Sequence, residues 1–484
     1  MSTTSTMLAG GNDTIAALAT ANGRGAVALI RISGPKAFDV ANALGAPADA
    51  AARAARRATL RDSESGDAID DALVTRFVAP HSFTGENVVE LSTHGGRVVP
   101  MAVLAACLRA GARQALPGEF TRRALLNGRI DLLQAEAIAD LVDARTSAMH
   151  AQALSQLDGG LSRRLSALRA DIIGLEVLLA YDIDFPEEDD GPIAPARIVA
   201  ATTKLVAQLR ALLATAPRAA LVRDGALVVI AGPPNAGKSS LFNALLGEAR
   251  ALVTEIPGTT RDAIEALLDT PGLPLRLVDT AGLRTTDDVV ERLGIEVSER
   301  YLAQAQLVLA CGEDVAGLIT TIERVSPLTR APITSVLTKA DQRTNLLGDL
   351  ALASASITAR ALRDESRGRP GANQQRSVVL PVSAESGAGL SALLTTIVAR
   401  LSENVDNPIG DDTTPLTRER HRIAMTQALE EVSAFQQAWI EDEVPATIAA
   451  VHLRAAAHVL DELVGSISVD DVLDKLFRDF CVGK

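Results

Sequence analysis

The chain has 484 residues, enough for about three domains that each bury a core. Hydrophobic residues make up 47% of the sequence and charged residues 22%, which is a globular composition and excludes a disordered chain. The formal net charge of −13 disfavours broad binding to a phosphate backbone, so a nucleic-acid partner would need a local basic patch or presentation by another protein.

The cysteines and the N-terminus bear on the compartment. Three cysteines (Cys107, Cys311 and Cys481) in so long a chain argue against a disulfide scaffold and for a reducing cytoplasm. Residues 1–7 lack the basic flank and apolar core of a secretory signal. No apolar run approaches the roughly 20 residues of a membrane span. We therefore expect a cytoplasmic protein with no membrane partner.

Residues 1–130 are predicted to form an α+β domain, strands with a few helices on one face. The Ala- and Arg-rich stretch 46–57 is expected to be a peripheral helix or loop. Apolar, β-branched runs predict strands, and one longer apolar run predicts a helix. The strands are expected at 13–18, 25–34, 72–78 and 87–92, and the helix at 98–108.

Long helices are predicted on both sides of an α/β domain at residues 224–402. Apolar stripes at helical spacing start at Leu133, Leu161 and Ile198, and we interpret all three as core packing. The acidic stretch 181–190 is expected to be a solvated loop. Helices resume at 418–440, 446–464 and 470–480. This order predicts one discontinuous helical domain, built from residues 131–223 and 403–484, into which the α/β domain is inserted.

Residues 232–239 read Gly-Pro-Pro-Asn-Ala-Gly-Lys-Ser and fit the phosphate-loop pattern G-x-x-x-x-G-K-[S/T]. The loop follows an apolar run, 226–231, that is typical of a buried strand, and it precedes apolar residues at helical spacing. A strand that turns through glycines into a helix aims backbone N–H groups at one point, where a polyphosphate binds. Lys238 is expected to reach the terminal phosphates, and the Ser239 hydroxyl to ligate Mg²⁺.

Further motifs follow in the order of a guanine-nucleotide site. Asp279 ends a predicted strand, 275–278, where a carboxylate serves Mg²⁺, and Asp341 follows a strand at 333–337 and can accept two hydrogen bonds from guanine. Residues 383–385, after a strand at 378–382, can offer a backbone N–H to the guanine oxygen, and 258–262 supply the switch threonine. The order and spacing resemble the translation-factor-related GTPases with a Ras-like P-loop domain. The residues expected to contact GTP are Asn235, Ala236, Gly237, Lys238, Ser239, Ser240, Thr254, Glu255, Ile256, Pro257, Gly258, Thr259, Thr260, Asp279, Thr280, Ala281, Gly282, Thr338, Lys339, Ala340, Asp341, Ser383, Ala384 and Glu385.

Two features depart from the usual GTPase pattern. Residues 342–377 form a long polar segment between two motifs that usually lie closer together, and its end, 364–376, is expected to be mobile. Thr338 replaces the usual Asn of the guanine motif. Its hydroxyl could still tie the motif to the phosphate loop, so we expect altered affinity but unaltered base choice.

Short motifs recur along the chain at 13–15, 23–34, 82–87, 94–96, 117–124, 132–141, 183–188, 234–245 and 480–484. Together they cover nearly its whole length and resemble the MnmE (TrmE) family of tRNA modification GTPases. The resemblance implies an N-terminal folate-binding, dimerising domain, and a homodimer that assembles with an FAD-containing partner, MnmG, into a heterotetramer. Together they would add an aminomethyl or carboxymethylaminomethyl group to C5 of the wobble uridine of certain tRNAs. A reduced folate, 5,10-methylene- or 5-formyl-tetrahydrofolate, would be the one-carbon donor.

The resemblance also implies residue roles. The folate site would use Arg31, Glu90, Arg129 and Lys484; a carboxylate suits the paired donors of a pterin, and cations suit the glutamate tail. Arg129 stands where the family often has Lys, which keeps the charge but changes the geometry. Read without the family, each of these residues is an ordinary surface charge.

GTP hydrolysis needs a group that positions water, and Leu283 occupies the place of the Ras-like Gln. The resemblance points to Glu291, which otherwise reads as an acidic residue at a helix start. It also implies K⁺ bound by Asn235, Thr254, Ile256 and Thr259, and Mg²⁺ bound by Ser239 and Thr260. Such a K⁺ would neutralise charge as an arginine finger does once two nucleotide domains of a dimer meet.

Cys481 remains open between a reactive catalytic thiol beside Lys484 and a small packing residue. Cys311 is interpreted as core. Two other classes of function compete with a tRNA-modifying GTPase: a GTP-timed ribosome-assembly factor, which would usually carry a basic RNA-binding domain, and a scaffold whose switch only recruits partners.

Overall fold

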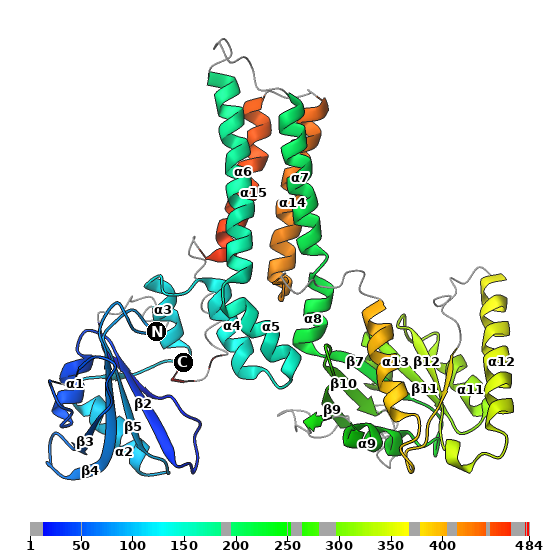
Figure 1. Ribbon diagram of the computed structural model, residues 1–484, viewed down its shortest axis with the longest axis horizontal. Coiled ribbons are helices and arrows are strands. Elements are labelled where there is room, and N and C mark those ends of the chain that lie inside the picture. Colours follow the sequence, from blue (N-terminus) through cyan, green and yellow to red (C-terminus); the bar gives the residue numbers. More distant parts are fainter. Residues whose placement is uncertain are drawn as a thin grey trace, which may run out of the picture. The chain divides into compact units, whose positions relative to one another are not determined.

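The computed structural model describes residues 13–49, 51–184, 195–248, 250–252, 264–279, 297–366, 378–403, 414–441, 446–465, 480 and 482–483. The chain divides into two compact units, residues 1–139 with 157–169 and 457–484, and residues 140–156 with 170–456. The domain boundaries predicted at 130, 223 and 402 stay a prediction. The combination of an α+β domain, long helices and an α/β domain is confirmed (Figure 1).

The N-terminal domain is built on a six-stranded sheet in the order β3-β4-β5-β2-β1-β6. Neighbouring strands run antiparallel except β1 and β6, which are parallel. The strands are β1 (Ile15–Leu18), β2 (Val27–Ser33), β3 (Arg56–Arg61), β4 (Ala68–Phe77), β5 (Val88–His94) and β6 (Arg113–Gln114). The helices are α1 (Ala37–Ala43), α2 (Val99–Arg109) and α3 (Glu119–Leu126).

The two faces of this sheet bury different partners. Alternate β2 residues Ile30 and Ile32 point into a core that α1 and α2 complete, while Arg31 between them points to the other face. On that other face Phe120 of α3 packs with Ile15 of β1. The expectation that 46–57 is a helix or loop is wrong at its end, because β3 begins at Arg56. The strand pattern of β3 is weak in the sequence, because only Ala58 and Leu60 point inward and arginines flank them on this edge strand.

The helical region contains α4 (Leu132–Asp143), α5 (Ser147–Leu157), α6 (Gly160–Asp184), α7 (Pro195–Leu213), α8 (Ala216–Asp224), α14 (Glu419–Glu441) and α15 (Ala446–Val464). The stripes that start at Leu161 and Ile198 are buried, as predicted. The acidic loop expected at 181–190 is wrong at its start, because α6 continues to Asp184, and its remainder lies outside the described residues. The helix predicted at 470–480 also lies outside them, apart from Phe480.

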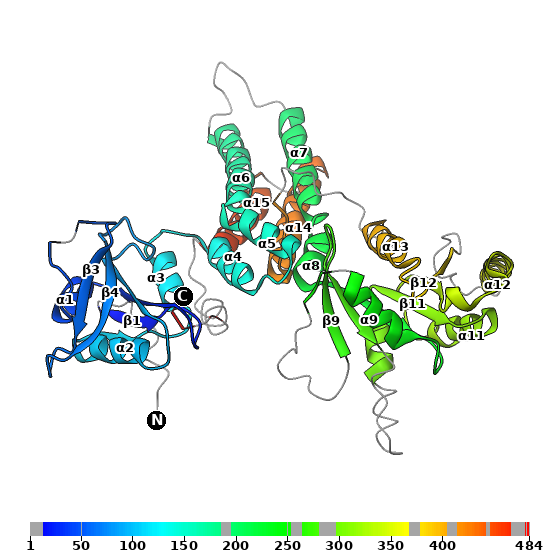
Figure 2. The same ribbon diagram turned by 60° about the horizontal axis from the view of Figure 1, so that its bottom comes forward.

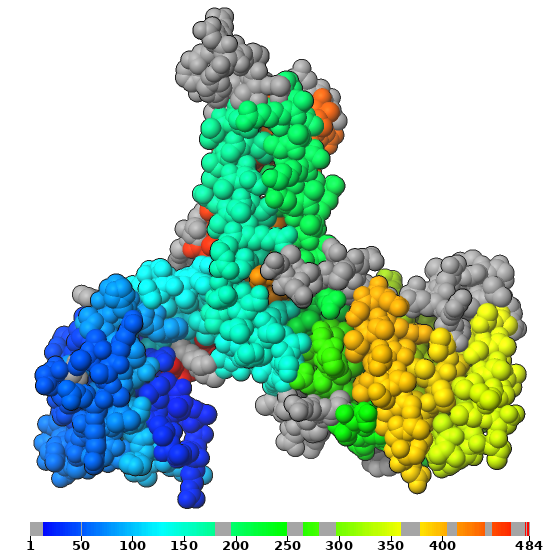
Figure 3. Space-filling view, in the orientation of Figure 1, coloured from blue at the N-terminus to red at the C-terminus, as the bar shows by residue number. Residues whose placement is uncertain are grey.

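Within the second unit α7 and α14 lie side by side (Figures 1 and 2). Figure 3 shows α7 covering much of the orange α14 from this side. Contrary to the expectation from sequence, residues 195–224 are long and apolar enough to cross a membrane by length and hydropathy alone. In the most apolar window of this stretch, 44% is buried inside the protein.

The α/β domain has a seven-stranded sheet in the order β13-β12-β11-β7-β10-β9-β8, in which the five strands from β13 to β10 are parallel. The strands are β7 (Ala226–Ala231), β8 (Arg250–Leu252), β9 (Ile264–Asp269), β10 (Leu275–Asp279), β11 (Leu307–Gly312), β12 (Ile333–Leu337) and β13 (Val379–Pro381). The helices are α9 (Lys238–Glu248), α11 (Val315–Val325), α12 (Leu346–Ser366) and α13 (Leu390–Glu403), with a 3₁₀ turn, η2, at Ala340–Gln342.

Both faces of this sheet are covered, as expected for buried parallel strands (Figure 2). Helices α9 and α13 complete the core on one face, and α11 completes cores on the other. Much of the polar segment 342–377, whose order the sequence left open, is helical. Its end, 364–376, was expected to be mobile, but α12 continues to Ser366, and the remainder lies outside the described residues. Helix α12 occupies 346–366 and buries Ala353 beside α11, because a sparse apolar stripe at 346, 350, 353 and 357 suffices for one helix face.

Candidate functional site

The phosphate loop connects the buried central strand β7 to α9. Glycine is required at both of its ends. A Cβ on Gly232 would lie 2.6 Å from the Cys311 carbonyl oxygen of the neighbouring strand, and Gly237 has a φ of +74°. Asn235 also takes a left-handed φ of 62°, so the loop curls tightly before α9 begins at Lys238. Backbone N–H groups of such a curled loop at a helix N-terminus form an anion site.

Lys238 and Ser239 are held at the head of α9. The Lys238 ammonium donates to the Pro233 carbonyl oxygen at 2.7 Å and is buried. The Ser239 hydroxyl donates to the Asp279 carboxylate at 2.6 Å, and Asp279, at the end of β10, is only 1% exposed. A hydroxyl and a carboxylate that meet beside a phosphate loop are the hard oxygen donors that Mg²⁺ prefers, so these residues fit the predicted metal.

Thr338 joins the guanine motif to the phosphate loop. Its hydroxyl lies 2.8 Å from the Ala236 carbonyl oxygen and 3.0 Å from that of Gly312. The contact expected from the sequence is therefore present. Lys339 follows with a left-handed φ of 52° and pairs with Glu313 at 2.6 Å. The motif thus leaves β12 in a fixed direction and presents Asp341 from η2.

The base and phosphate regions are adjacent pockets. One, of about 160 Å³, is lined by Asp341, Ala384 and Glu385 together with Leu241 and Gln342. The other, of about 500 Å³, is lined by residues 234, 235 and 237–240 and by Lys339. Gly237, Ser240 and Lys339 line both pockets, so together they offer room for a base at one end and a polyphosphate at the other.

The structure refines which N–H group can meet guanine. The Ser383 N–H already donates to the Ala388 carbonyl oxygen at 2.9 Å, and the Ser383 hydroxyl accepts from the Ser386 N–H at 3.1 Å. These bonds fix the loop after β13. Ala384 and Glu385, the other two residues of this motif, line the base pocket.

Of the predicted GTP residues, 235–240, Asp279, 338–341 and 383–385 meet at the carboxyl ends of four parallel strands, the usual ligand edge of such sheets. Sequence reasoning missed Leu241 and Gln342, although each directly follows or neighbours a recognised motif. The remaining predicted residues lie outside the described part of the chain: Thr254, Glu255, Ile256, Pro257, Gly258, Thr259, Thr260, Thr280, Ala281, Gly282, Glu291, Cys481 and Lys484.

Cys311 is confirmed as a core residue. Its side chain is fully buried in the sheet, and burial raises the pKa of its thiol to about 12. Cys107 is also buried, and burial raises its pKa to about 12 as well. Neither thiol is suited to nucleophilic chemistry at neutral pH.

The N-terminal domain holds a second polar site. Arg31 donates to Glu90 Oε1 through Nε at 3.0 Å and through Nη2 at 2.8 Å, so the second carboxylate oxygen is not used by this arginine. The Arg31 guanidinium carbon lies 5.5 Å from the ring centroid of Phe83 and 5.7 Å from that of Phe120. Cation–π contacts of this kind hold a guanidinium in place while its remaining donors stay available. The sequence did not point to either ring.

Arg129 belongs to the same neighbourhood. A Cβ built on Gly85 would lie 3.2 Å from the Arg129 Cγ, so the 82–87 loop packs on this side chain. The chain end reaches this domain as well, because Val482 forms a β-bridge with Pro117. Gly483 fits against Leu18 so closely that a Cβ there would lie 2.3 Å from the Leu18 carbonyl oxygen.

The fold and the pocket define a P-loop nucleotide-binding protein with a guanine-recognition motif, the GTPase class. Family models match residues 14–129 as the "GTP-binding protein TrmE N-terminus" and 132–481 as the "MnmE helical domain". The proteins named tRNA modification GTPase MnmE from Heliobacterium modesticaldum and Azoarcus sp. are 40% and 41% identical to this chain. Each match covers 98% of this chain, and 99% and 98% of those proteins. The chain belongs to the MnmE family of tRNA modification GTPases.

Among solved structures, the G domain of the T. maritima FeoB iron transporter matches 36% of this chain and 98% of its own length. The identity is 24% and the TM-score 0.23.

Proposed function

We propose that this protein is a K⁺-stimulated GTP hydrolase that acts with an FAD-dependent, MnmG-like partner on certain tRNAs. The pair would add an aminomethyl or carboxymethylaminomethyl group to C5 of the wobble uridine, with a tetrahydrofolate as one-carbon donor. The observation that carries the proposal is the joined base and phosphate pocket in a chain of this family. Its named relatives are tRNA modification GTPases.

In the nucleotide step, each described group has a definite task. Asp341 would accept two hydrogen bonds from guanine, and Lys238 and the curled loop would hold the phosphates. Ser239 and Thr260 would ligate Mg²⁺, with Asp279 beside them. This ion would neutralise the charge that develops on the phosphate oxygens during hydrolysis.

Hydrolysis would depend on groups brought together by dimerisation. Asn235, whose side chain stands on the exposed rim of the phosphate pocket, would provide one K⁺ ligand, with Thr254, Ile256 and Thr259 as the others. Glu291 would position the attacking water, since Leu283 cannot. A rate indifferent to exchange of K⁺ for Na⁺ at equal concentration would contradict this part of the proposal.

In the N-terminal domain, Arg31, Glu90 and Arg129 would bind the reduced folate. The free oxygen of Glu90 suits paired pterin donors, and the arginines suit carboxylates of the glutamate tail. The position of Val482 and Gly483 against this domain supports a contribution from Lys484, the next residue. The role of Cys481 stays open between direct chemistry and packing, and a Cys481→Ser variant separates them. We further propose a cytoplasmic homodimer that forms a heterotetramer with the flavoprotein.

Nucleoside analysis of tRNA from cells that lack the gene tests this function. We expect the C5-substituted wobble uridines to disappear, to return with the unaltered gene, and to stay absent with Lys238→Ala. Normal nucleosides in the deletion strain would refute the proposal. A ribosome-subunit imbalance with intact nucleosides would instead favour the ribosome-assembly reading.

A further inference from the structure

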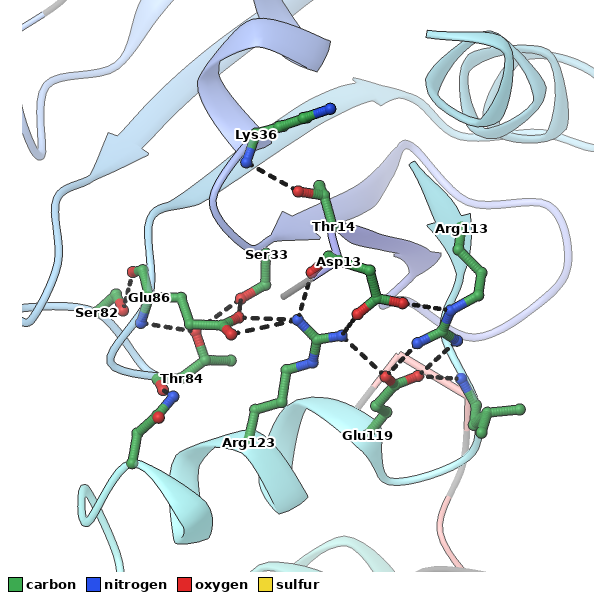
Figure 4. Close-up of polar contacts among 12 residues, drawn as sticks. Asp13, Thr14, Ser33, Lys36, Ser82, Thr84, Glu86, Arg113, Glu119 and Arg123 are labelled. Atoms are coloured by element: carbon green, nitrogen blue, oxygen red, sulfur yellow. Dashed lines mark hydrogen bonds and ion pairs between the residues drawn. The ribbon is translucent and has the colours of Figure 1, made fainter. Parts of the chain in front are cut away.

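Five charged side chains of the N-terminal domain form one connected cluster around Arg123 (Figure 4). Arg123 Nη2 donates to Asp13 Oδ1 at 2.7 Å and to Glu119 Oε1 at 3.0 Å. Its Nη1 donates to the Asp13 carbonyl oxygen at 2.9 Å and to both Glu86 carboxylate oxygens at 3.2 Å. Arg113 pairs with Asp13 at 2.7 Å and with Glu119 at 2.6 Å. We call these five residues the Arg123 cluster.

Charge and burial make this cluster rigid. Burial alone would raise the pKa of Asp13 and Glu119, but hydrogen bonds and charge from Arg113 and Arg123 outweigh burial and lower both. Burial would likewise lower the pKa of Arg123, and the neighbouring carboxylates raise it instead. The Arg123 side chain is 7% exposed, and its planar fork holds three carboxylates at once, a geometry that lysine cannot reproduce.

Through Glu86 the Arg123 cluster fixes the 82–87 loop. Ser33 donates to Glu86 Oε2 at 2.7 Å and also lies 2.7 Å from the Thr84 hydroxyl. The Ser82 hydroxyl donates to the Glu86 carbonyl oxygen at 2.6 Å, which closes the loop on itself. Removal of Arg123 would leave Glu86 without its only described cationic partner.

The parts that Arg123 joins are the parts that hold the proposed folate arginines. Phe83 of the loop and Phe120 of α3 flank the Arg31 guanidinium, and Gly85 of the same loop packs on Arg129. Arg123 is itself part of α3, the helix that carries Phe120, and it reaches the loop through Glu86. Arg123 touches neither Arg31 nor Arg129 in the described contacts, but it belongs to this helix and bonds to the loop that carries Phe83 and Gly85.

We propose that Arg123 is a positioning residue for anion binding: through Glu86 and the 82–87 loop it fixes the spacing of Arg31 and Arg129 for a ligand with several carboxylates. This inference rests on the proposed folate function and deepens it. Arg113, unlike Arg123, does not contact Glu86 in the described contacts. It pairs with Asp13 and Glu119 but has no described contact with the loop, so it stabilises the cluster without setting the two arginines.

A double-mutant cycle in the full-length dimer tests this role. The probe is 5-formyltetrahydrofolate, titrated into the unaltered chain, Arg123→Met, Phe83→Ala and the double variant, with Arg113→Met as the matched control. We expect Arg123→Met and Phe83→Ala each to raise the Kd for the folate roughly tenfold. The Kd of the double variant should exceed that of the weaker-binding single variant by no more than about twofold. Arg113→Met should lower the melting temperature but change folate affinity by less than about threefold, because Arg123 still holds Glu86 in place.

The outcomes are distinct. The inference would be overturned if the double variant lost folate affinity by the product of the two single losses. It would also be overturned if Arg123→Met and Arg113→Met lost folate affinity equally, because the role of Arg123 would then be merely structural. An unaltered chain that does not bind folate, or an Arg31→Ala variant that binds it normally, would instead overturn the proposed folate function, and the role of Arg123 with it. Unchanged GDP affinity in every variant checks that the nucleotide domain is folded.

Discussion

The hydroxyl of Thr338 offers the sharpest test of how the guanine motif is joined to the phosphate loop. The hydroxyl has one proton and two carbonyl oxygens within reach, at 2.8 Å (Ala236) and 3.0 Å (Gly312). Thr338→Val keeps the shape of the side chain and removes this donor. Ala236 is 1% exposed, so water cannot readily replace the lost hydrogen bond to its carbonyl oxygen. Leaving a buried acceptor unpaired costs about 1–3 kcal/mol.

The affinity changes only by the difference between this cost in the nucleotide-bound state and in the nucleotide-free state. We expect about 1–2 kcal/mol, or roughly a five- to thirtyfold higher Kd for both GDP and GTP. Preference for guanine over adenine should not change, because Asp341 is untouched. Titration of a fluorescent GDP analogue, with unlabelled GTP and ATP as competitors, measures both quantities. A Kd within twofold of the unaltered chain would refute the coupling, and a loss of base preference would show that Thr338 contributes to base recognition directly.

Three further outcomes follow from the described contacts. In the unaltered chain we expect Mg²⁺ to tighten GDP binding about tenfold, or about 1.4 kcal/mol, and in Ser239→Ala this effect of Mg²⁺ should disappear. GDP titrations with and without Mg²⁺ measure both values. An equal effect of Mg²⁺ in the two proteins would contradict the assignment of Ser239 as a Mg²⁺ ligand. Gly483→Ala should lower the melting temperature, because a Cβ would collide with the Leu18 carbonyl oxygen, whereas Gly66→Ala, with the same sign of φ but open space, should lower it less. Equal melting temperatures of the two variants, measured by calorimetry, would contradict this contact. The raised pKa of Cys311 stabilises the fold below about pH 9, and this stability should be lost as the pH rises towards about 12. Urea unfolding should therefore show a shallower alkaline loss in Cys311→Ala, and identical slopes would count against it.

The nucleotide site was predictable because its chemistry is local in sequence. A β-branched run such as 226–231, a glycine turn and a helix start specify one another within a few residues, and β7 begins and ends where expected. The same holds for β12 and α15, whose predicted bounds match. Even the bond from Thr338 to the phosphate loop followed from residue type and motif order.

What the sequence did not reveal depends on contacts between distant segments. Phe83 and Phe120 reach Arg31 only after β2, the 82–87 loop and α3 have packed, and aromatic residues read in isolation indicate core. Arg123 is similar, since a basic residue in a short helix looks solvated until three carboxylates from three segments surround it. Helix α12 was missed because its apolar stripe is too narrow to stand out in a polar segment.

The β-bridge between Pro117 and Val482 has a consequence for biosynthesis. Val482 leaves the ribosome only after the whole nucleotide domain has been translated. At about 5–20 residues per second, the roughly 365 residues from Pro117 to Val482 take on the order of 20–70 s. Until then the first domain to emerge lacks its contacts with Val482 and Gly483. A nascent chain that stalls before this point would display an N-terminal domain without this β-bridge to chaperones and proteases.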